Sequence, residues 1–124
     1  MKHLMLAVAL FCFVAAGAGA EDTAKHAVLY KTPQCGCCEN YADHLRENGF
    51  KVTVKATREM PAISAKAGIS VDFQGYHANF IDGYVVSGHV PANIVKQLLA
   101  LRPPIKGITL PGMPMGSPGM SGPK

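Results

Sequence analysis

The sequence AVLYKTPQCGCC, residues 27–38, determines how the rest of the chain is interpreted. It begins with a short apolar run from Ala27 to Tyr30, which is typical of a strand covered on both faces. Thr32-Pro33 ends this run, and three cysteines follow at once: Cys35, Cys37 and Cys38. Thiols at this spacing indicate either a soft-metal thiolate site or a thioredoxin-like redox pair made by Cys35 and Cys38.

A helix is expected to start at the cysteines. Apolar or small residues recur at Cys38, Ala42 and Leu45 on one helical face, and Asn48-Gly49 supplies a stop signal. The cysteines therefore lie at the amino-terminal end of the helix. Exposed backbone amides and the positive end of the helix dipole favour thiolates over thiols there.

The first twenty residues have the pattern of an export signal. Lys2 and His3 precede an apolar run from Leu4 to Ala16, and Ala18-Gly19-Ala20 is a small-residue cleavage pattern. The run is shorter than the ~20 apolar residues of a membrane-spanning helix, so no membrane anchor is expected after cleavage. We therefore expect a signal peptide at 1–20, cleaved after about Ala20, and an exported mature protein.

The mature chain keeps three cysteines, an odd number, in an oxidising compartment. A structural disulfide cannot use all three, although one disulfide plus one inert thiol is an alternative to a functional cluster. The formal charge of +4 for the whole chain is spread along the sequence without a block of Lys or Arg. We therefore expect no nucleic-acid partner.

The remaining pattern predicts a single small α/β domain at 27–110, after an amino-terminal arm at 21–26. The elements expected after the first helix are a strand at 51–55, a helix between Pro61 and Gly68, strands at 77–81 and 84–88, a helix starting at Pro91 and ending before Pro103-Pro104, and a short edge strand with Ile108 and Leu110. This order builds a mixed sheet with flanking helices and resembles the thioredoxin arrangement.

The expected hairpin gathers two histidines at its open end. Asp82-Gly83 is a two-residue turn signal, and its register places His77 opposite Gly88, with Tyr76 across from His89. In the thioredoxin arrangement, the loop that enters the hairpin lies beside the cysteine motif. His77 and His89 are therefore candidate metal ligands, with a purely polar structural role as the alternative.

Three other side chains are expected to have no ligand role. Tyr76 is interpreted as a packing residue beside the site. His44 follows Cys37 by two helical turns, which is too far to share an ion, and we expect it to be solvated. His26 is expected to be solvated on the amino-terminal arm.

The tail at 111–124 is rich in Gly and Pro and cannot bury a core. It carries Met113, Met115 and Met120. These methionines either belong to a disordered tail with no function or supply thioether donors to a metal. Thiolates select Cu(I), Zn(II) or iron–sulfur clusters, and thioethers narrow that choice toward Cu(I).

Three separated segments resemble the CopG-type family of periplasmic copper-resistance proteins. They are Cys35-Gly36-Cys37-Cys38, the stretch from Asp82 to Pro91, and the stretch from Leu110 to Met120. The resemblance implies a metal-binding variant of the thioredoxin fold that holds copper, as Cu(I) in a multinuclear cluster. The ligands implied are Cys35, Cys37 and Cys38, supported by His77, His89, Met113, Met115 and Met120.

The function implied by this resemblance is copper resistance, through copper buffering, transfer or Cu(I)/Cu(II) interconversion. A further interpretation treats the methionine tail as a docking segment for a copper exporter or another periplasmic copper protein. The alternative function, from the residues alone, is a thiol–disulfide oxidoreductase that uses Cys35 and Cys38.

The sequence departs from the family pattern at two positions. Tyr76 stands where family members usually carry a cysteine before the histidine, and a phenol is a poor ligand for Cu(I). Ser70 stands where many relatives have a proline before the hairpin. We therefore expect a smaller cluster, or weaker copper binding, than in the relatives.

Overall fold

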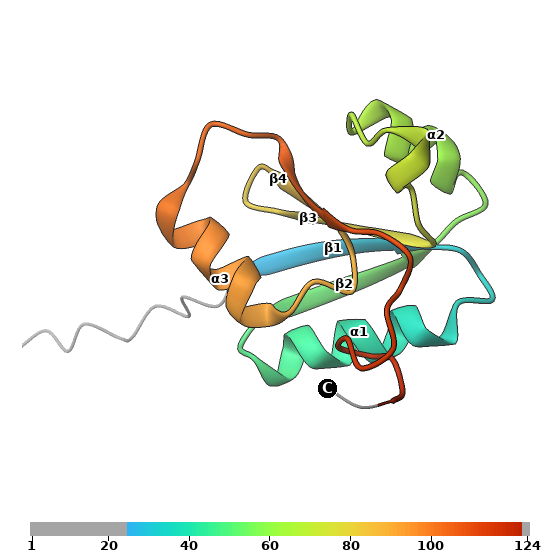
Figure 1. Ribbon diagram of the computed structural model, residues 1–124, viewed down its shortest axis with the longest axis horizontal. Helices are drawn as coiled ribbons and strands as arrows, with labels where there is room; N and C mark the ends of the chain where they lie inside the picture. The colour runs from blue at the N-terminus through green and yellow to red at the C-terminus, as the bar shows by residue number, and fades with distance from the viewer. Residues whose placement is uncertain (1–24, 123–124) are drawn as a thin grey trace, which may run out of the picture.

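The computed structural model describes residues 25–122 of the chain (Figure 1). The expected signal peptide at 1–20 and most of the expected arm lie outside this range. The elements, in chain order, are β1 (His26–Lys31), α1 (Gly36–Glu47), β2 (Lys51–Ala56), α2 (Met60–Lys66), the 3-10 turn η1 (Val71–Phe73), β3 (His77–Ile81), β4 (Tyr84–Gly88), α3 (Ala92–Leu101) and β5 (Gly107–Leu110). None of the helices in residues 25–122 is both long and apolar enough to cross a bilayer.

The strands form one mixed sheet in the order β2-β1-β3-β4-β5. β1 pairs in parallel with β2 and antiparallel with β3, and β4 pairs in parallel with β5. The predicted α/β mixed sheet with flanking helices is confirmed, and its order is compatible with the thioredoxin arrangement. The predicted hairpin register is also confirmed, because Phe80 lies opposite Val85 and Ile81 lies opposite Tyr84. Asp82 and Gly83 both have positive φ, as a two-residue hairpin turn requires.

The first strand begins at His26, so the placement of His26 on the amino-terminal arm was wrong, but its side chain is exposed to solvent, as predicted. His26 pairs with Lys51 in the β1–β2 register. Its Nε2 atom lies 2.8 Å from the Thr53 Oγ1 atom on β2. A polar contact across two paired strands extends the strand beyond the apolar run that marks it in the sequence.

Helices cover the two faces of the sheet unequally (Figure 1). α1 and α3 pack on one face, where Leu29 of β1 meets Tyr41 and Leu45 of α1 and Val95 of α3 in the larger core cluster. The smaller α2 lies on the other face. A fully buried leucine contributes about 1.5–3 kcal/mol, so this larger cluster fixes α1, and with it the cysteines, against the sheet.

The tail after β5 folds back over the domain (Figure 1). β5 confirms the short edge strand expected around Ile108 and Leu110. Residues 111–122 then turn toward α1, held by backbone hydrogen bonds from Ser117 to Pro114, from Met120 to Ser117, and from Gly116 to Ser121. The tail adds no residue to either buried core cluster. Its ordered turns nevertheless carry its methionines to defined places.

Gly107 allows β5 to approach β4. A Cβ atom at this position would overlap the carbonyl oxygen of Val85. We expect Gly107→Ala to lower the free energy of unfolding by about 1–3 kcal/mol, as overpacking does. Urea denaturation measures this change. Gly75→Ala is the matched control, because its added Cβ meets nothing within 4 Å. Equal stabilities for the two variants would mean that β5 does not pack against β4 in this way.

Candidate metal centre

The three cysteines lie at the start of α1, as predicted. Cys35 is the residue that caps the helix, and Cys37 and Cys38 occupy its first turn. Cys38 is fully buried, Cys35 is nearly so, and Cys37 is half-buried. The three sulfur atoms lie within 4.8 Å of one another. Within residues 25–122, Cys, His, Asp and Glu side chains come close enough to share one ion in a group of three or more at these three cysteines.

Two of the three sulfurs are joined in a Cys35–Cys38 disulfide, which leaves Cys37 as the free thiol of residues 25–122. The Cys37 Sγ atom lies 3.5 Å from the Cys35 Sγ atom. The pairing corresponds to the Cys-x-x-Cys redox pair that the spacing allows. Two electrons and two protons convert this disulfide to two thiols, and all three sulfurs then become potential ligands.

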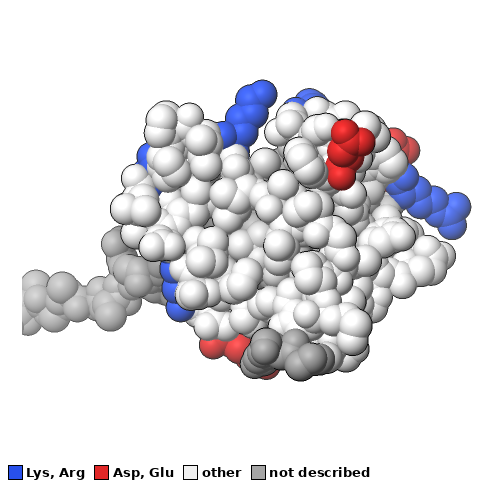
Figure 2. All heavy atoms as spheres, in the orientation of Figure 1, with Lys and Arg blue, Asp and Glu red and all other residues white. Residues whose placement is uncertain are grey.

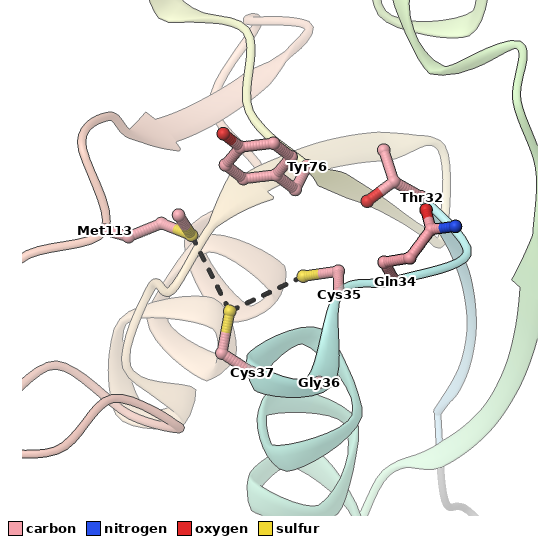
Figure 3. A pocket seen from close by; sticks show the side chains of 7 residues that line it. All are labelled: Thr32, Gln34, Cys35, Gly36, Cys37, Tyr76 and Met113. Atoms are coloured by element: carbon pink, nitrogen blue, oxygen red, sulfur yellow. Dashed lines mark hydrogen bonds between the residues drawn. The ribbon is translucent and has the colours of Figure 1, made fainter.

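A cavity of about 440 Å³ opens beside the cysteines (Figure 3). Its lining residues are Thr32, Gln34, Cys35, Gly36, Cys37, Tyr76 and Met113. The loop that enters the hairpin lies beside the cysteine motif, as expected, because the Thr32 amide donates to the Tyr76 carbonyl at 2.9 Å. Cys35 thus faces an open cavity through which a metal ion or a reductant can reach it.

Tyr76 lies at the rim of this cavity rather than in the core. Its side chain is 54% exposed, so the prediction of a packing residue was wrong. Figure 3 shows the Tyr76 ring on the side of the cavity opposite Cys37. A half-exposed phenol can keep its hydroxyl in water, so no apolar packing is needed to hold it there.

The tail delivers one thioether to the sulfurs. The Met113 Sδ atom lies 3.8 Å from the Cys37 Sγ atom (Figure 3). Met115 is 72% exposed and does not line the cavity. Met120 lines a separate, polar hollow between α1 and the tail. Of the three predicted methionine donors, the structure therefore brings only Met113 to the cysteines.

His77 and His89 are buried side by side. Their ring centroids lie 4.9 Å apart, and the Tyr41 ring lies 5.0 Å from His77 and 5.3 Å from His89. The open end of the hairpin thus gathers both histidines, as predicted. Their nitrogens are not part of the sulfur group described above.

The hydrogen bond of His89 determines its tautomer. The Nδ1 atom lies 2.6 Å from the Pro118 carbonyl oxygen, which can only accept, so neutral His89 carries its proton on Nδ1. The Nε2 atom then presents a lone pair, and this buried atom has no hydrogen-bond partner. A ring proton bonded to a backbone carbonyl and a free second nitrogen are typical of a metal-ligating histidine.

Burial makes His77 sensitive to acid. Desolvation, with the nearby His89 as the second cause, lowers the pKa of His77 from 6.5 to about 4, although its bond to the Gly88 carbonyl opposes the shift. Burial also lowers the pKa of His89. His77 has a pKa of 6.5 in the unfolded chain and of about 4 in the folded chain. Between these two pH values, the unfolded chain therefore binds more protons than the folded chain. The stabilising contribution of neutral His77 to folding is therefore complete above pH 6.5 and is lost as the pH falls toward 4.

We therefore expect the free energy of unfolding of the metal-free protein to fall by roughly 3 kcal/mol from neutral pH to about pH 4 on account of His77. Urea unfolding at a series of pH values measures this change. The control is His77→Gln, which should flatten the profile over the same range. An equally steep profile in His77→Gln would assign the acid sensitivity to other groups.

Sequence reasoning missed the roles of three residues around the site. Lys31 is buried at the end of β1, with its Nζ atom 3.2 Å from the Glu39 Oε1 atom, so it places a cation beside the cysteine loop. Its only sequence signal is its position on the same strand face as Ala27 and Leu29. Its ion pair with Glu39 joins the end of β1 to the first turn of α1.

Tyr41 is the second of these residues. It lies one helical turn after Cys38, on the same buried face of α1. Its hydroxyl donates to the Val90 carbonyl at 2.6 Å. Burial raises the pKa of Tyr41 above its ordinary value, so the phenol stays protonated as a donor.

His44 is the third, and the prediction that it is solvated was wrong. It is half-buried, and its Nε2 atom accepts a hydrogen bond from the Ala92 amide at 3.1 Å. This contact satisfies one free amide at the start of α3. A bond between residues so far apart in sequence leaves no local pattern.

Comparison with known proteins places the chain in a family. Residues 73–120 match the family described as "Protein of unknown function, DUF411". A search of curated proteins gives no match. The chain is similar to two solved structures of copper resistance protein CopG. Form 2 is 37% identical with a TM-score of 0.76, covering 81% of this chain and 80% of that one. Form 1 is 38% identical with a TM-score of 0.74, covering 79% of this chain and 78% of that one.

The chain belongs to the CopG family. The family membership inferred from the three sequence segments is thereby confirmed. The matched residues 73–120 contain the hairpin and most of the tail but not the cysteines. The structural similarity to CopG is wider and covers about four-fifths of the chain.

Proposed function

We propose that this protein binds copper and contributes to copper resistance by holding Cu(I) on the thiolates of Cys35, Cys37 and Cys38. The observation that carries the proposal is the donor set itself: three sulfurs within 4.8 Å of one another, with the Met113 thioether 3.8 Å from Cys37. Thiolate and thioether donors together favour Cu(I) over harder ions. The CopG neighbours, which are copper resistance proteins, support the same assignment.

The arrangement of the site suits a soft cation. Cys35 and Cys37 face the cavity, and both lie at the start of α1. His89, with its Nε2 lone pair free, and the adjacent His77 are further candidate ligands. Because Tyr76 provides no thiolate, we propose a cluster built on three thiolates, acting in the periplasm.

We expect Met113→Leu to lower the Cu(I) affinity of the reduced protein about 10-fold, because it removes the thioether but keeps the volume of the side chain. Competition with a chromophoric Cu(I) chelator measures the affinity. Met115→Leu is the matched control, because the structure places Met115 on the surface. A loss of affinity with Met115→Leu, and none with Met113→Leu, would contradict the proposed donor set.

The proposed function itself is tested by anaerobic titration of the reduced protein with Cu(I). We expect saturation at one or more ions per chain. The variant with Cys35, Cys37 and Cys38 replaced by Ser should bind none at the same chelator concentration. An unchanged stoichiometry in that variant would overturn the proposal.

The Cys35–Cys38 disulfide favours a second candidate function, thiol–disulfide exchange. In the reduced protein, the Cys35 thiolate would attack a substrate disulfide, forming a mixed disulfide and releasing one substrate thiolate. Cys38 would then attack the Cys35 sulfur, releasing the second substrate thiolate and restoring the Cys35–Cys38 bond. Two electrons pass to the substrate. Cys37 argues against this function, because its sulfur lies 3.5 Å from Cys35 and competes with Cys38.

Insulin reduction by the metal-free protein separates the two candidates. A copper-binding protein should show no catalysed reduction above the rate of the thiol reagent alone. Turnover that disappears in Cys38→Ser would support the oxidoreductase.

A further inference from the structure

The tail crosses α1 so closely that only glycine fits at residue 119. A Cβ atom on Gly119 would lie 2.8 Å from the Tyr41 backbone nitrogen and 3.1 Å from both the Cys37 carbonyl oxygen and the His89 Nδ1 atom. Its φ of +83° also suits glycine. The tail backbone therefore lies directly on the helix turns that follow the cysteines.

The residue before Gly119 is held by a buried side chain. The Pro118 carbonyl accepts the hydrogen bond from His89 Nδ1 at 2.6 Å, and His89 is fully buried. Asn40 adds a longer contact from its side-chain amide to the Gly119 carbonyl. His89 directly follows β4, so this bond ties the tail to the sheet as well as to α1.

The segment that carries Met113 is thus fixed at both ends. Before it, Leu110 of β5 pairs with Gly88 of β4. After it, Pro118 and Gly119 are held by His89 and α1. The loop between these two points is short, and it places the Met113 thioether on Cys37. Release of the second end would let the thioether leave the sulfurs.

We propose that His89 and Gly119 form a latch that holds Met113 against Cys37, so that the latch gives the thiolate site its preference for Cu(I) over Zn(II). The inference rests on the proposed copper-binding function, and it makes His89 a positioning residue through Nδ1. Thioether ligation favours Cu(I), whereas Zn(II) takes thiolate and imidazole ligands and gains nothing from Met113.

The latch does not depend on charge. Residues 107–122 contain no charged side chain. In Figure 2 the Lys, Arg, Asp and Glu side chains lie near the margins of this face, and its centre carries none. Steric fit and the hydrogen bonds from His89 and Asn40 therefore hold the tail, and added salt should not release it.

The first test compares Gly119→Ala with Gly112→Ala in the full chain. Both glycines have positive φ, but a Cβ at Gly112 meets nothing within 4 Å, so only Gly119→Ala adds a clash. In the oxidised, metal-free protein the disulfide protects Cys35 and Cys38. The rate of iodoacetamide alkylation at Cys37, followed by peptide mass spectrometry, then reports whether Met113 covers the thiol.

We expect alkylation of Cys37 in Gly119→Ala to be on the order of 10-fold faster than in the unmodified chain, because the clash shifts the tail toward its open form. Gly112→Ala should stay close to the unmodified rate. Equal rates in the two variants would overturn the latch.

The second test separates the two nitrogens of His89. The amide nitrogen of Asn takes about the place of Nδ1, and that of Gln takes about the place of Nε2. His89→Asn should therefore keep the slow alkylation of Cys37, and His89→Gln should lose it. If the two variants behave alike, the bond from His89 to Pro118 is not the latch.

The third test is the metal preference of the reduced protein. Gly119→Ala should weaken Cu(I) binding about 10-fold in chelator competition and leave Zn(II) binding unchanged. Equal weakening of both metals would contradict the role in selectivity.

If Cys37 alkylation responds as expected but no variant binds Cu(I), the latch stands and the proposed function fails. If the cysteines bind Cu(I) and alkylation is unchanged, only the latch fails.

Discussion

Reduction of the Cys35–Cys38 disulfide is expected to raise the Cu(I) affinity of this protein by several orders of magnitude. In the oxidised form, two of the three sulfurs are bonded to each other, which leaves Cys37 and Met113 as sulfur donors. Thiolates are the anionic sulfur ligands for Cu(I), and reduction raises their number at the site from one to three. Isothermal titration or chelator competition on both forms, under anaerobic conditions, measures the difference.

The matched control for this switch is Cys38→Ser. This variant cannot form the Cys35–Cys38 disulfide, so oxidant should lower its affinity only to the extent that Cys35 bonds to Cys37, whose sulfur lies 3.5 Å away. Peptide mass spectrometry without reduction detects that bond. It should also bind Cu(I) more weakly than the reduced parent protein, because one thiolate is missing. An oxidised parent protein that binds Cu(I) as tightly as the reduced one would contradict the thiolate site.

Tyr41→Ala is expected to lower the free energy of unfolding by about 3–5 kcal/mol, the range for removing a large buried aromatic side chain. The Tyr41 ring contacts the rings of His77 and His89, and its hydroxyl bonds to the Val90 carbonyl. Small domains have only about 5–15 kcal/mol to lose, so the variant should be near the limit of stability. Urea denaturation of the metal-free protein measures the loss.

Tyr41→Phe provides the comparison. It keeps the ring but leaves the Val90 carbonyl without its donor, so we expect a loss of about 1–3 kcal/mol. The difference between the two variants is the contribution of the ring to the packing of α1 on the sheet. If Tyr41→Ala were no worse than Tyr41→Phe, the ring would not be part of the core that positions the cysteines.

Local patterns predicted most of the fold. The turn at Asp82-Gly83 determined the hairpin register, and that register placed His77 and His89 together. Asn48-Gly49 marked the end of α1, which the structure confirms at Glu47. These features are readable because they depend on neighbouring residues and on the period of each element.

Long-range contacts could not be predicted in the same way. His44 caps a helix 48 residues away, Tyr41 bonds to a carbonyl 49 residues away, and Met113 reaches a cysteine 76 residues away. Gly119 is one of many glycines in a Gly/Pro-rich tail, and only the fold shows that it lies against α1. The sequence thus predicted that the three cysteines lie together at a helix start and that His77 and His89 lie together, but not the contacts that hold these residues in place.

The most direct test of the central claim is X-ray absorption at the copper edge of the reduced, copper-loaded protein. We expect Cu(I) with a first shell dominated by sulfur, and the loss of that shell in the variant with Ser at positions 35, 37 and 38. A first shell of nitrogen and oxygen only, or an unchanged sulfur shell in the triple variant, would contradict the assignment of copper to these cysteines.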